Sequence, residues 1–211
     1  MPQADFRSSN RALTTEPAPR SESRCNDGRI TTVYRHVKIE HDGDEGLARC
    51  RNISAGGMRL NASIPLNLND HVIVTFCRTE LTGQVVWLSG NDCGIAFDQP
   101  VDCEQLLHNA ALDTIRGASR PHRLRASLPA KVAYEGKTCP TMVADISVRG
   151  MKIAHEGDFQ PGLHVRVILN NGCEKEGVVR WSKDNIAGVI LLDPFAVEDL
   201  GSVQRLCRPS Q

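Results

Sequence analysis

The chain has 211 residues, a length that suits two domains of about 100 residues each better than one. Lys and Arg total 25 and Asp and Glu total 25, so the formal net charge is zero. A neutral chain lacks the basic field that general nucleic-acid binding needs. The longest apolar runs, such as residues 189–192, have the length of a strand and not of a membrane span. We therefore expect no binding of nucleic acid polymers and no membrane insertion.

The N-terminal segment is rich in Ser, Thr, Pro, Arg and Glu and poor in large apolar side chains. It cannot bury enough apolar surface to offset the entropy of ordering it, so residues 1–23 are predicted to form a disordered tail. The segment also lacks the apolar run of a secretory signal, which favours a cytoplasmic location. The eight cysteines include no closely spaced pair and the histidines are isolated, so we expect reduced, structural thiols and no metal site.

After the tail come short stretches with alternating or β-branched residues, separated by turns rich in Asp, Asn and Gly. They predict six strands, at residues 30–39, 47–50, 57–60, 71–77, 82–88 and 93–97. Residues 101–115 then place Leu107, Ala110, Ala111 and Ile115 at helical spacing. Six short strands with tight connections predict an antiparallel barrel, here followed by one helix.

The same plan is then repeated, with strand-like residues over 128–192 and a weaker helical pattern over 195–207. Asn52 and the similar Asp145 are 93 positions apart, and Trp87 and Trp181 are 94 apart. Landmarks that share nearly one offset indicate a duplication. We therefore predict two independent domains, residues 24–116 and 117–211. Because large aromatic side chains in strands usually pack inside, both tryptophans are expected in the cores.

Each half carries an [Asp or Asn]-x-Ser-x-x-Gly turn directly before a strand. The turns consist of Asn52, Ser54 and Gly57 in the first half and Asp145, Ser147 and Gly150 in the second. Such a turn can bind an anion, because the glycine is expected to adopt a φ that other residues rarely reach and to free a backbone N–H. The serine hydroxyl can donate to a phosphate, and the carboxylate can accept from the edge of a base.

Arginines precede both turns. They are Arg24 and Arg29 before the first turn and Arg116, Arg120, Arg123 and Arg125 before the second. Arg29 lies 23 residues before Asn52, and Arg123 lies 22 residues before Asp145. The guanidinium group binds phosphate oxygens with two hydrogen bonds and stacks on planar bases. Four arginines in ten residues therefore supply a local basic patch on a neutral chain.

An arginine segment followed by this turn, present twice, resembles the PilZ family, bacterial domains that bind the second messenger cyclic di-GMP. The resemblance covers about residues 24–205. It implies a mainly β fold with two six-stranded antiparallel barrels, each followed by a C-terminal helix.

The resemblance also implies the ligand contacts. In the second half these are Arg116, Arg120, Arg123, Asp145, Ser147 and Gly150, and in the first half Arg24, Arg29, Asn52, Ser54 and Gly57. The family pattern has three residues between its two arginines. Arg116 and Arg120 meet that spacing, whereas Arg120 and Arg123 are nearer the turn but have only two residues between them, so either pair could act.

The function that follows is a receptor that couples cyclic di-GMP binding to a change in domain arrangement or in contact with a protein partner. The alternative is a pair of degenerate PilZ-like barrels that mediate protein interactions without nucleotide. No nucleophile elbow or phosphate-binding loop of an enzyme is present in the sequence. We expect neither catalysis nor a cofactor besides the ligand.

Overall fold

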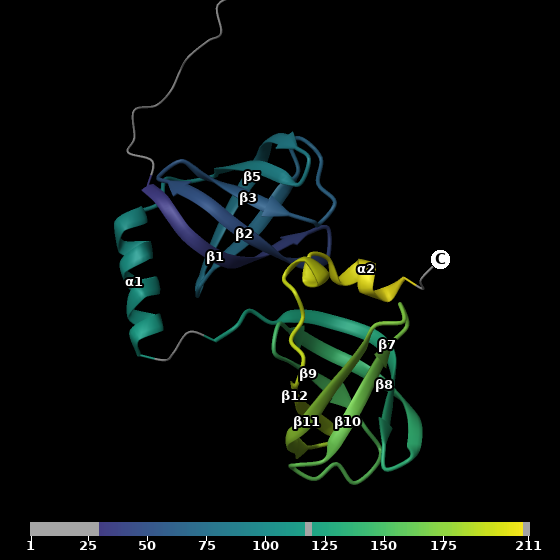
Figure 1. Cartoon of the computed structure of the whole chain (residues 1–211). Coiled ribbons are helices and arrows are strands. Elements are labelled where there is room, and N and C mark those ends of the chain that lie inside the picture. The colour runs from purple at the N-terminus through teal and green to yellow at the C-terminus, as the bar shows by residue number, and fades with distance from the viewer. Residues whose placement is uncertain (1–29, 117–119, 209–211) are drawn as a thin grey trace, which may run out of the picture.

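The computed structural model describes residues 30–116 and 120–208, and the side chains of all of these except residues 30–34. The predicted tail, residues 1–23, and the predicted contacts Arg24 and Arg29 lie outside the described residues. Two barrels make up the fold, and the C-terminal segment, drawn in yellow, lies between them (Figure 1).

The first half forms a closed antiparallel barrel, as predicted, with the strand order β1-β2-β3-β6-β5-β4. Its strands are β1 (Ile30–His41), β2 (Asp44–Ser54), β3 (Gly57–Ala62), β4 (His71–Phe76), β5 (Thr79–Ser89) and β6 (Asp92–Phe97). The predicted helix follows as α1 (Cys103–Ile115), which buries Leu106 and Ala110 against the barrel core. The side chain of Asp102 accepts a hydrogen bond from the Gln105 N–H and so caps the helix start.

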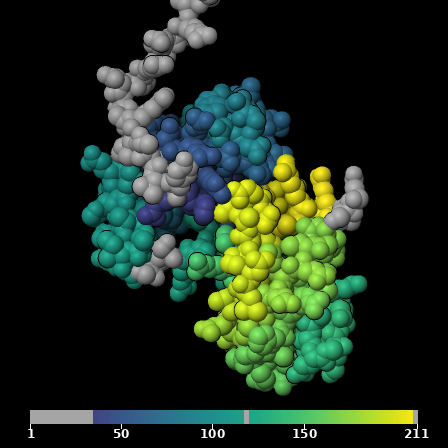
Figure 2. All heavy atoms as spheres, in the orientation of Figure 1, coloured from purple at the N-terminus to yellow at the C-terminus, as the bar shows by residue number. Residues whose placement is uncertain are grey.

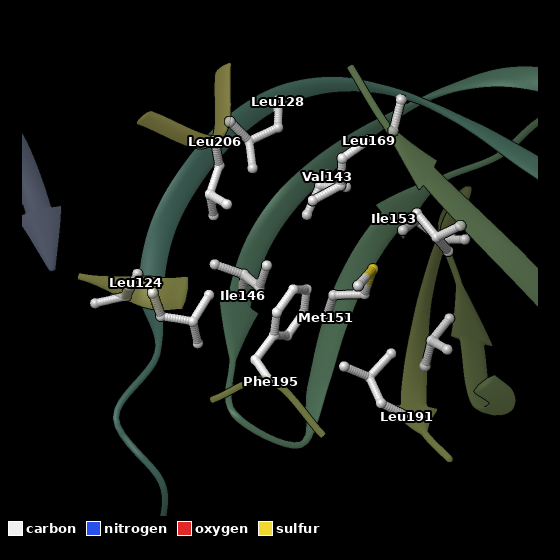
Figure 3. Packing of buried hydrophobic residues seen from close by; sticks show 14 of the residues in the cluster. Leu124, Leu128, Val143, Ile146, Met151, Ile153, Leu169, Leu191, Phe195 and Leu206 are labelled. Atoms are coloured by element: carbon white, nitrogen blue, oxygen red, sulfur yellow. The ribbon is translucent and has the colours of Figure 1, made fainter. Parts of the chain in front are cut away.

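The second half forms an equivalent closed barrel, with the order β7-β8-β9-β12-β11-β10. Its strands are β7 (Leu124–Tyr134), β8 (Lys137–Ser147), β9 (Gly150–Ala154), β10 (His164–Leu169), β11 (Glu174–Lys183) and β12 (Ile186–Leu191). Alternate residues of these strands point inward, and Figure 3 shows Val143, Ile146, Met151 and Ile153 packed with Phe195 in this core. Two closed barrels with the same strand order agree with the predicted duplication.

The helix predicted over residues 195–207 is only partly present. The segment contains a short 3-10 helix, η1 (Glu198–Leu200), and a five-residue helix, α2 (Val203–Cys207). Ser202 interrupts them with extended backbone, and its hydroxyl accepts a hydrogen bond from the Arg205 N–H as the cap of α2. A capping serine after Gly201 favours a new helix start over a continuous helix.

The two barrels share an interface in this structure. Leu47 of the first barrel is 3% exposed and belongs to the core cluster of the second. The carboxylate of Asp44 accepts hydrogen bonds from the Ser202 hydroxyl at 2.5 Å and from the Gln204 N–H at 3.0 Å. The hairpin joining β1 and β2 thus packs on the C-terminal segment, which runs along the second barrel and reaches the first (Figure 2).

A buried carboxylate also joins the barrels. Glu45, 5% exposed, accepts hydrogen bonds from the Arg125 backbone N–H at 2.6 Å and from Arg125 Nε at 2.8 Å. Lys38 Nζ lies 3.2 Å from the same carboxylate. Burial would raise the pKa of Glu45, but the hydrogen bonds from Arg125 and the charge of Lys38 together lower it below its usual value of 4.5. Glu45 is therefore held as an anion at neutral pH.

This lowered pKa predicts a loss of stability in acid. A carboxyl group whose pKa is lower in the folded state stabilises the fold above its unfolded pKa, and this contribution disappears as the pH falls through the folded pKa. We expect the thermal midpoint to fall more steeply below pH 4.5 in the native protein than in Glu45→Gln, whose amide does not titrate. Thermal unfolding followed by circular dichroism from neutral pH downward measures this. Parallel curves for the two proteins would contradict the prediction.

Candidate functional site

The second barrel carries an open cavity of about 360 Å³ on the side of its Ser-x-x-Gly turn. Four of the predicted residues, Arg120, Arg123, Ser147 and Gly150, line it. We call this cavity the second-barrel hollow. Another predicted residue, Asp145, lies beside it, because Arg123 Nη1 donates to Asp145 Oδ1 at 2.5 Å.

Asp145 is the charged centre of this site. Its second oxygen, Oδ2, pairs with Lys152 Nζ on the neighbouring strand β9 at 2.6 Å. The residue is only 9% exposed, whereas the side chain of Arg123 is 50% exposed. Asp145 thus holds one terminal nitrogen of the Arg123 guanidinium, while half of the Arg123 side chain remains exposed. The register shift in β8 between Val143 and Asp145 brings the carboxylate to this position.

The turn itself is held by its serine. Ser147 is buried, and its hydroxyl donates to the Gly150 carbonyl at 2.9 Å. In the first barrel Ser54 donates to the Gly57 carbonyl at 3.2 Å. The structure thus gives each serine hydroxyl a hydrogen-bond partner within its own turn.

The expected reason for the turn glycines is wrong. Neither Gly57 nor Gly150 has a positive φ. Instead, a Cβ at Gly150 would lie 2.6 Å from the Val189 carbonyl oxygen, and one at Gly57 would lie 2.3 Å from that of Ile95. Glycine is required because β3 runs too close to β6, and β9 too close to β12, to admit a side chain at these points.

Of the two predicted arginine pairs, only Arg120 and Arg123 both line the hollow. Arg116 ends α1 as its exposed C-cap and does not line the second-barrel hollow. Arg149 and Arg180 do line it, together with Arg120 and Arg123. Sequence reasoning missed these two, although Arg149 lies within the turn motif and Arg180 directly precedes Trp181. We call residues 120–125 the Arg arm.

The prediction that both tryptophans belong to the cores is wrong. Trp87 is 38% exposed and Trp181 is 42% exposed. The register of β5 shifts between Val85 and Trp87, and that of β11 shifts between Val179 and Trp181. Such a bulge breaks the alternation of the strand and turns a side chain to the other face. The indole of Trp181 consequently lies in the second-barrel hollow, against the backbone of Gly188.

The first barrel has an equivalent cavity of about 310 Å³, lined by Asn52, Ser54, Gly57 and Trp87 among others. Its only arginine among the described residues is Arg59. That side chain is engaged already, because it pairs with Asp92 and lies over the Trp87 ring at 5.7 Å from the centroid. The two cavities therefore have equivalent turn residues and an equivalent tryptophan, but they differ in the arginines that line them.

The second-barrel hollow can accommodate an anion with a planar ring. Four guanidinium groups supply hydrogen bonds to phosphate, and a half-exposed indole supplies an apolar face for stacking. Over residues 30–116 and 120–208, no group of His, Cys, Asp and Glu side chains is arranged to hold a metal ion. In the same ranges, none of the helices has the length and apolar character to cross a membrane.

The contact between indole and glycine predicts a specific response to substitution. A Cβ at Gly188 would lie 2.2 Å from Trp181 Nε1. Because the indole is half-exposed and can swing outward, Gly188→Ala should move it into water at a cost of about 1 kcal/mol in stability. The tryptophan fluorescence should shift to longer wavelength. Gly94→Ala is the matched variant for Trp87, and unchanged emission in both variants would contradict the prediction.

Comparison with known proteins identifies the domains. Residues 18–112 and residues 116–208 each match the PilZ domain. No curated protein matches this chain.

The solved structures that resemble the chain share little sequence with it. The Borreliella burgdorferi PlzA protein in complex with c-di-GMP is 13% identical over 83% of this chain and 88% of that chain, with a TM-score of 0.39. The Bacillus subtilis inhibitor of motility (MotI/DgrA) is 14% identical over 81% and 93%, with a TM-score of 0.33. Escherichia coli YcgR in complex with c-di-GMP is 12% identical over 81% of each chain, with a TM-score of 0.28. Since the PilZ domain matches twice and covers most of the sequence, the chain belongs to the PilZ domain family.

Proposed function

We propose that this protein is a receptor for cyclic di-GMP whose main site is the second-barrel hollow. One observation carries the proposal: Arg120, Arg123, Arg149 and Arg180 face a single hollow beside Asp145 in a PilZ domain. A cyclic dinucleotide has two phosphates and two guanine bases, and guanidinium groups bind the former and stack on the latter.

Each residue has a role in this proposal. Arg120 and Arg123 bind the phosphates and the guanine faces, and Asp145 accepts hydrogen bonds from the N–H edge of a guanine. Ser147 and Gly150 keep the turn in place through their mutual hydrogen bond. Trp181, which sequence reasoning had assigned to the core, offers its exposed ring face to the ligand. Arg116 is a peripheral contact ahead of the Arg arm.

The first barrel offers a weaker site. Its proposed contacts are Asn52, Ser54 and Gly57 with Arg24 and Arg29 from the preceding segment. Asn52 is uncharged, and Arg59, the only described arginine in that cavity, is paired with Asp92. We therefore expect one strong binding event per chain, with a second, weaker one at most.

The proposed output is a change in how the two domains, residues 24–116 and 117–211, are arranged or in which protein partner they contact. Arg125 lies two residues after Arg123 and binds Glu45 and Glu40 of the first barrel. If ligand contacts pull the Arg arm toward the second barrel, they also pull Arg125 away from Glu45 and Glu40 and so weaken this contact between the barrels. The protein acts as a cytoplasmic effector without catalysis in this proposal, and its cofactor requirement is limited to the ligand.

Calorimetric titration of the full chain with cyclic di-GMP tests the receptor proposal. We expect saturable binding near one ligand per chain, absent with GTP as the control ligand. In Asn52→Ala the main binding event should be unchanged. Absence of binding heat from folded protein would overturn the proposal and favour the alternative, a PilZ-like interaction module that needs no nucleotide.

A further inference from the structure

A cavity of about 600 Å³ lies in the second barrel, at the end of β8 and β9 that is remote from the Ser-x-x-Gly turn. We call it the hairpin-end cavity. No residue lines both this cavity and the second-barrel hollow. Its volume falls within the range of about 300–1,000 Å³ that small-molecule sites occupy. Its walls are Val132 and Tyr134 of β7, residues 139–142 of β8, residues 154–157 with Phe159 after them, and residues 184–186 at the turn between β11 and β12.

The cavity exists because β8 and β9 part before β8 reaches its first residue. β8 begins at Lys137, but its pairing with β9 begins only at Val143. The Thr141 hydroxyl donates to the Ala154 carbonyl at 2.5 Å, where the gap between the two strands opens. Pro140, inside the unpaired stretch, has no N–H, which makes this edge a poor template for a further strand. The gap is therefore suited to a small molecule and not to an added strand.

Three rings form one wall of the hairpin-end cavity. Phe159 is 3% exposed, and its ring centroid lies 4.8 Å from that of Tyr134 and 4.4 Å from that of His155. His155 is fixed in turn, because its Nε2 lies 2.8 Å from Ser182 Oγ and its backbone N–H donates to the Asn185 carbonyl at 2.9 Å. The aromatic wall is thus formed before any ligand arrives, and a ligand does not have to order it.

The charge around this cavity is negative. Glu156 and Asp184 line it and are exposed, and none of its described lining residues is Lys or Arg. Among the ion pairs of residues 30–116 and 120–208, Asp184 takes part in one, with the exposed Lys183 at 3.9 Å, and Glu156 takes part in none. Two carboxylates beside an aromatic wall attract a cation and repel an anion, the reverse of the arginine-lined second-barrel hollow.

We propose that the hairpin-end cavity binds a small organic cation with an apolar body, of the alkylammonium or arylammonium class. The apolar part fills the gap between β8 and the turn at Ile186, over the buried Val132. The positive charge lies against the ring of Tyr134 and near the carboxylate of Glu156. Aromatic rings bind such cations through the negative charge of their faces. This proposal does not depend on the receptor proposal, because the two cavities have no residue in common.

Benzyltrimethylammonium is the probe for this site, and phenylacetate, an aromatic anion of similar size, is the control ligand. A ligand of about ten non-hydrogen atoms should bind with a dissociation constant of about 1–10 mM. Amide chemical shifts of the labelled full chain measure the titration and also locate it. We expect the probe to shift the amides of His155 and Asn185, and phenylacetate to leave them unchanged, even if phenylacetate occupies the arginines of the second-barrel hollow.

A cysteine in the wall gives a second local measurement. Cys139 lines the cavity and is half-buried, whereas Cys207 is exposed in α2 and lies outside the cavity. Probe that fills about four-fifths of the sites should slow alkylation of Cys139 by iodoacetamide about fivefold. The alkylation of Cys207 should keep its rate, and peptide mass spectrometry separates the two products.

Variants test the ring and the charge separately. Tyr134→Leu should weaken binding of the probe about threefold or more, whereas Tyr134→Phe keeps the ring face and should bind like the native protein. Glu156→Gln should weaken binding about twofold to threefold, because it removes one exposed charge. Glu80→Gln, at an exposed position of β5 outside the cavity, is the matched control and should change nothing. If Tyr134→Leu fails to fold, Glu156→Gln still tests the site.

Three results would each overturn the cation site. They are equal shifts of the His155 and Asn185 amides by phenylacetate, unchanged alkylation of Cys139 in the presence of the probe, and equal affinity of Glu156→Gln and Glu80→Gln. Cyclic di-GMP should bind Glu156→Gln as it binds the native protein, because Glu156 does not line the second-barrel hollow. Failure of one proposal therefore leaves the other standing.

Discussion

Replacing Asp145 with alanine should weaken cyclic di-GMP binding about 100-fold or more. The substitution removes the acceptor for a guanine edge, and hydrogen bonds to a charged group contribute about 1.5–3 kcal/mol each. It also releases Arg123 and Lys152, which the carboxylate holds at 2.5 and 2.6 Å. Arg123 would then lose its orientation toward the hollow. Calorimetric titration of the variant against the native protein measures the effect.

Two further variants make this test specific. Asp145→Asn keeps the shape and one acceptor oxygen but loses the charge that orients Arg123, so its affinity should lie between those of the native protein and Asp145→Ala. Asp98→Ala removes an exposed carboxylate of the first barrel that forms no ion pair with any residue the structure describes, and it should bind like the native protein. Native affinity in Asp145→Ala would show that the turn carboxylate plays no part in binding.

Gly46→Ala should separate the two barrels. A Cβ at Gly46 would lie 2.1 Å from the carbonyl oxygen of Gly201, and its three nearest heavy atoms all belong to the backbone of Gly201 and Ser202. Since these backbone atoms cannot rotate away as a side chain could, we expect the first barrel to move off the C-terminal segment. The Leu47 packing and the hydrogen bonds from Asp44 to Ser202 and Gln204 would be strained or lost. We expect a loss of about 3 kcal/mol in the free energy of unfolding.

Small-angle scattering and thermal unfolding measure this separation directly. The radius of gyration should increase and the thermal midpoint should fall, while the far-ultraviolet circular dichroism of the two barrels stays the same. Gly56→Ala is the matched control, because a Cβ there meets nothing within 4 Å. A native radius of gyration in Gly46→Ala would mean that the contact between Gly46 and Gly201 does not hold the barrels together.

The sequence alone determined the class of fold, and it predicted where the proposed main site lies. Alternating apolar residues predict strands wherever one face of a sheet is buried, and this pattern repeats along both halves. The offset of the turn motifs showed the duplication without any structure. The turn and the Arg arm could be recognised because both are short local patterns, and the structure brings Arg120, Arg123, Ser147 and Gly150 to one hollow.

The tertiary structure decided what depends on contacts between distant strands. Trp181 faces the hollow because of a bulge between β11 and β12, which the alternation in the sequence did not reveal. Gly150 is required by the closeness of Val189 on another strand and not by its own backbone angle. The interface built from Asp44, Glu45 and Leu47 joins groups about 80 to 160 positions apart. A local pattern records the preferences of neighbouring residues, whereas bulges, close approaches and interfaces arise only when the barrels close and pack.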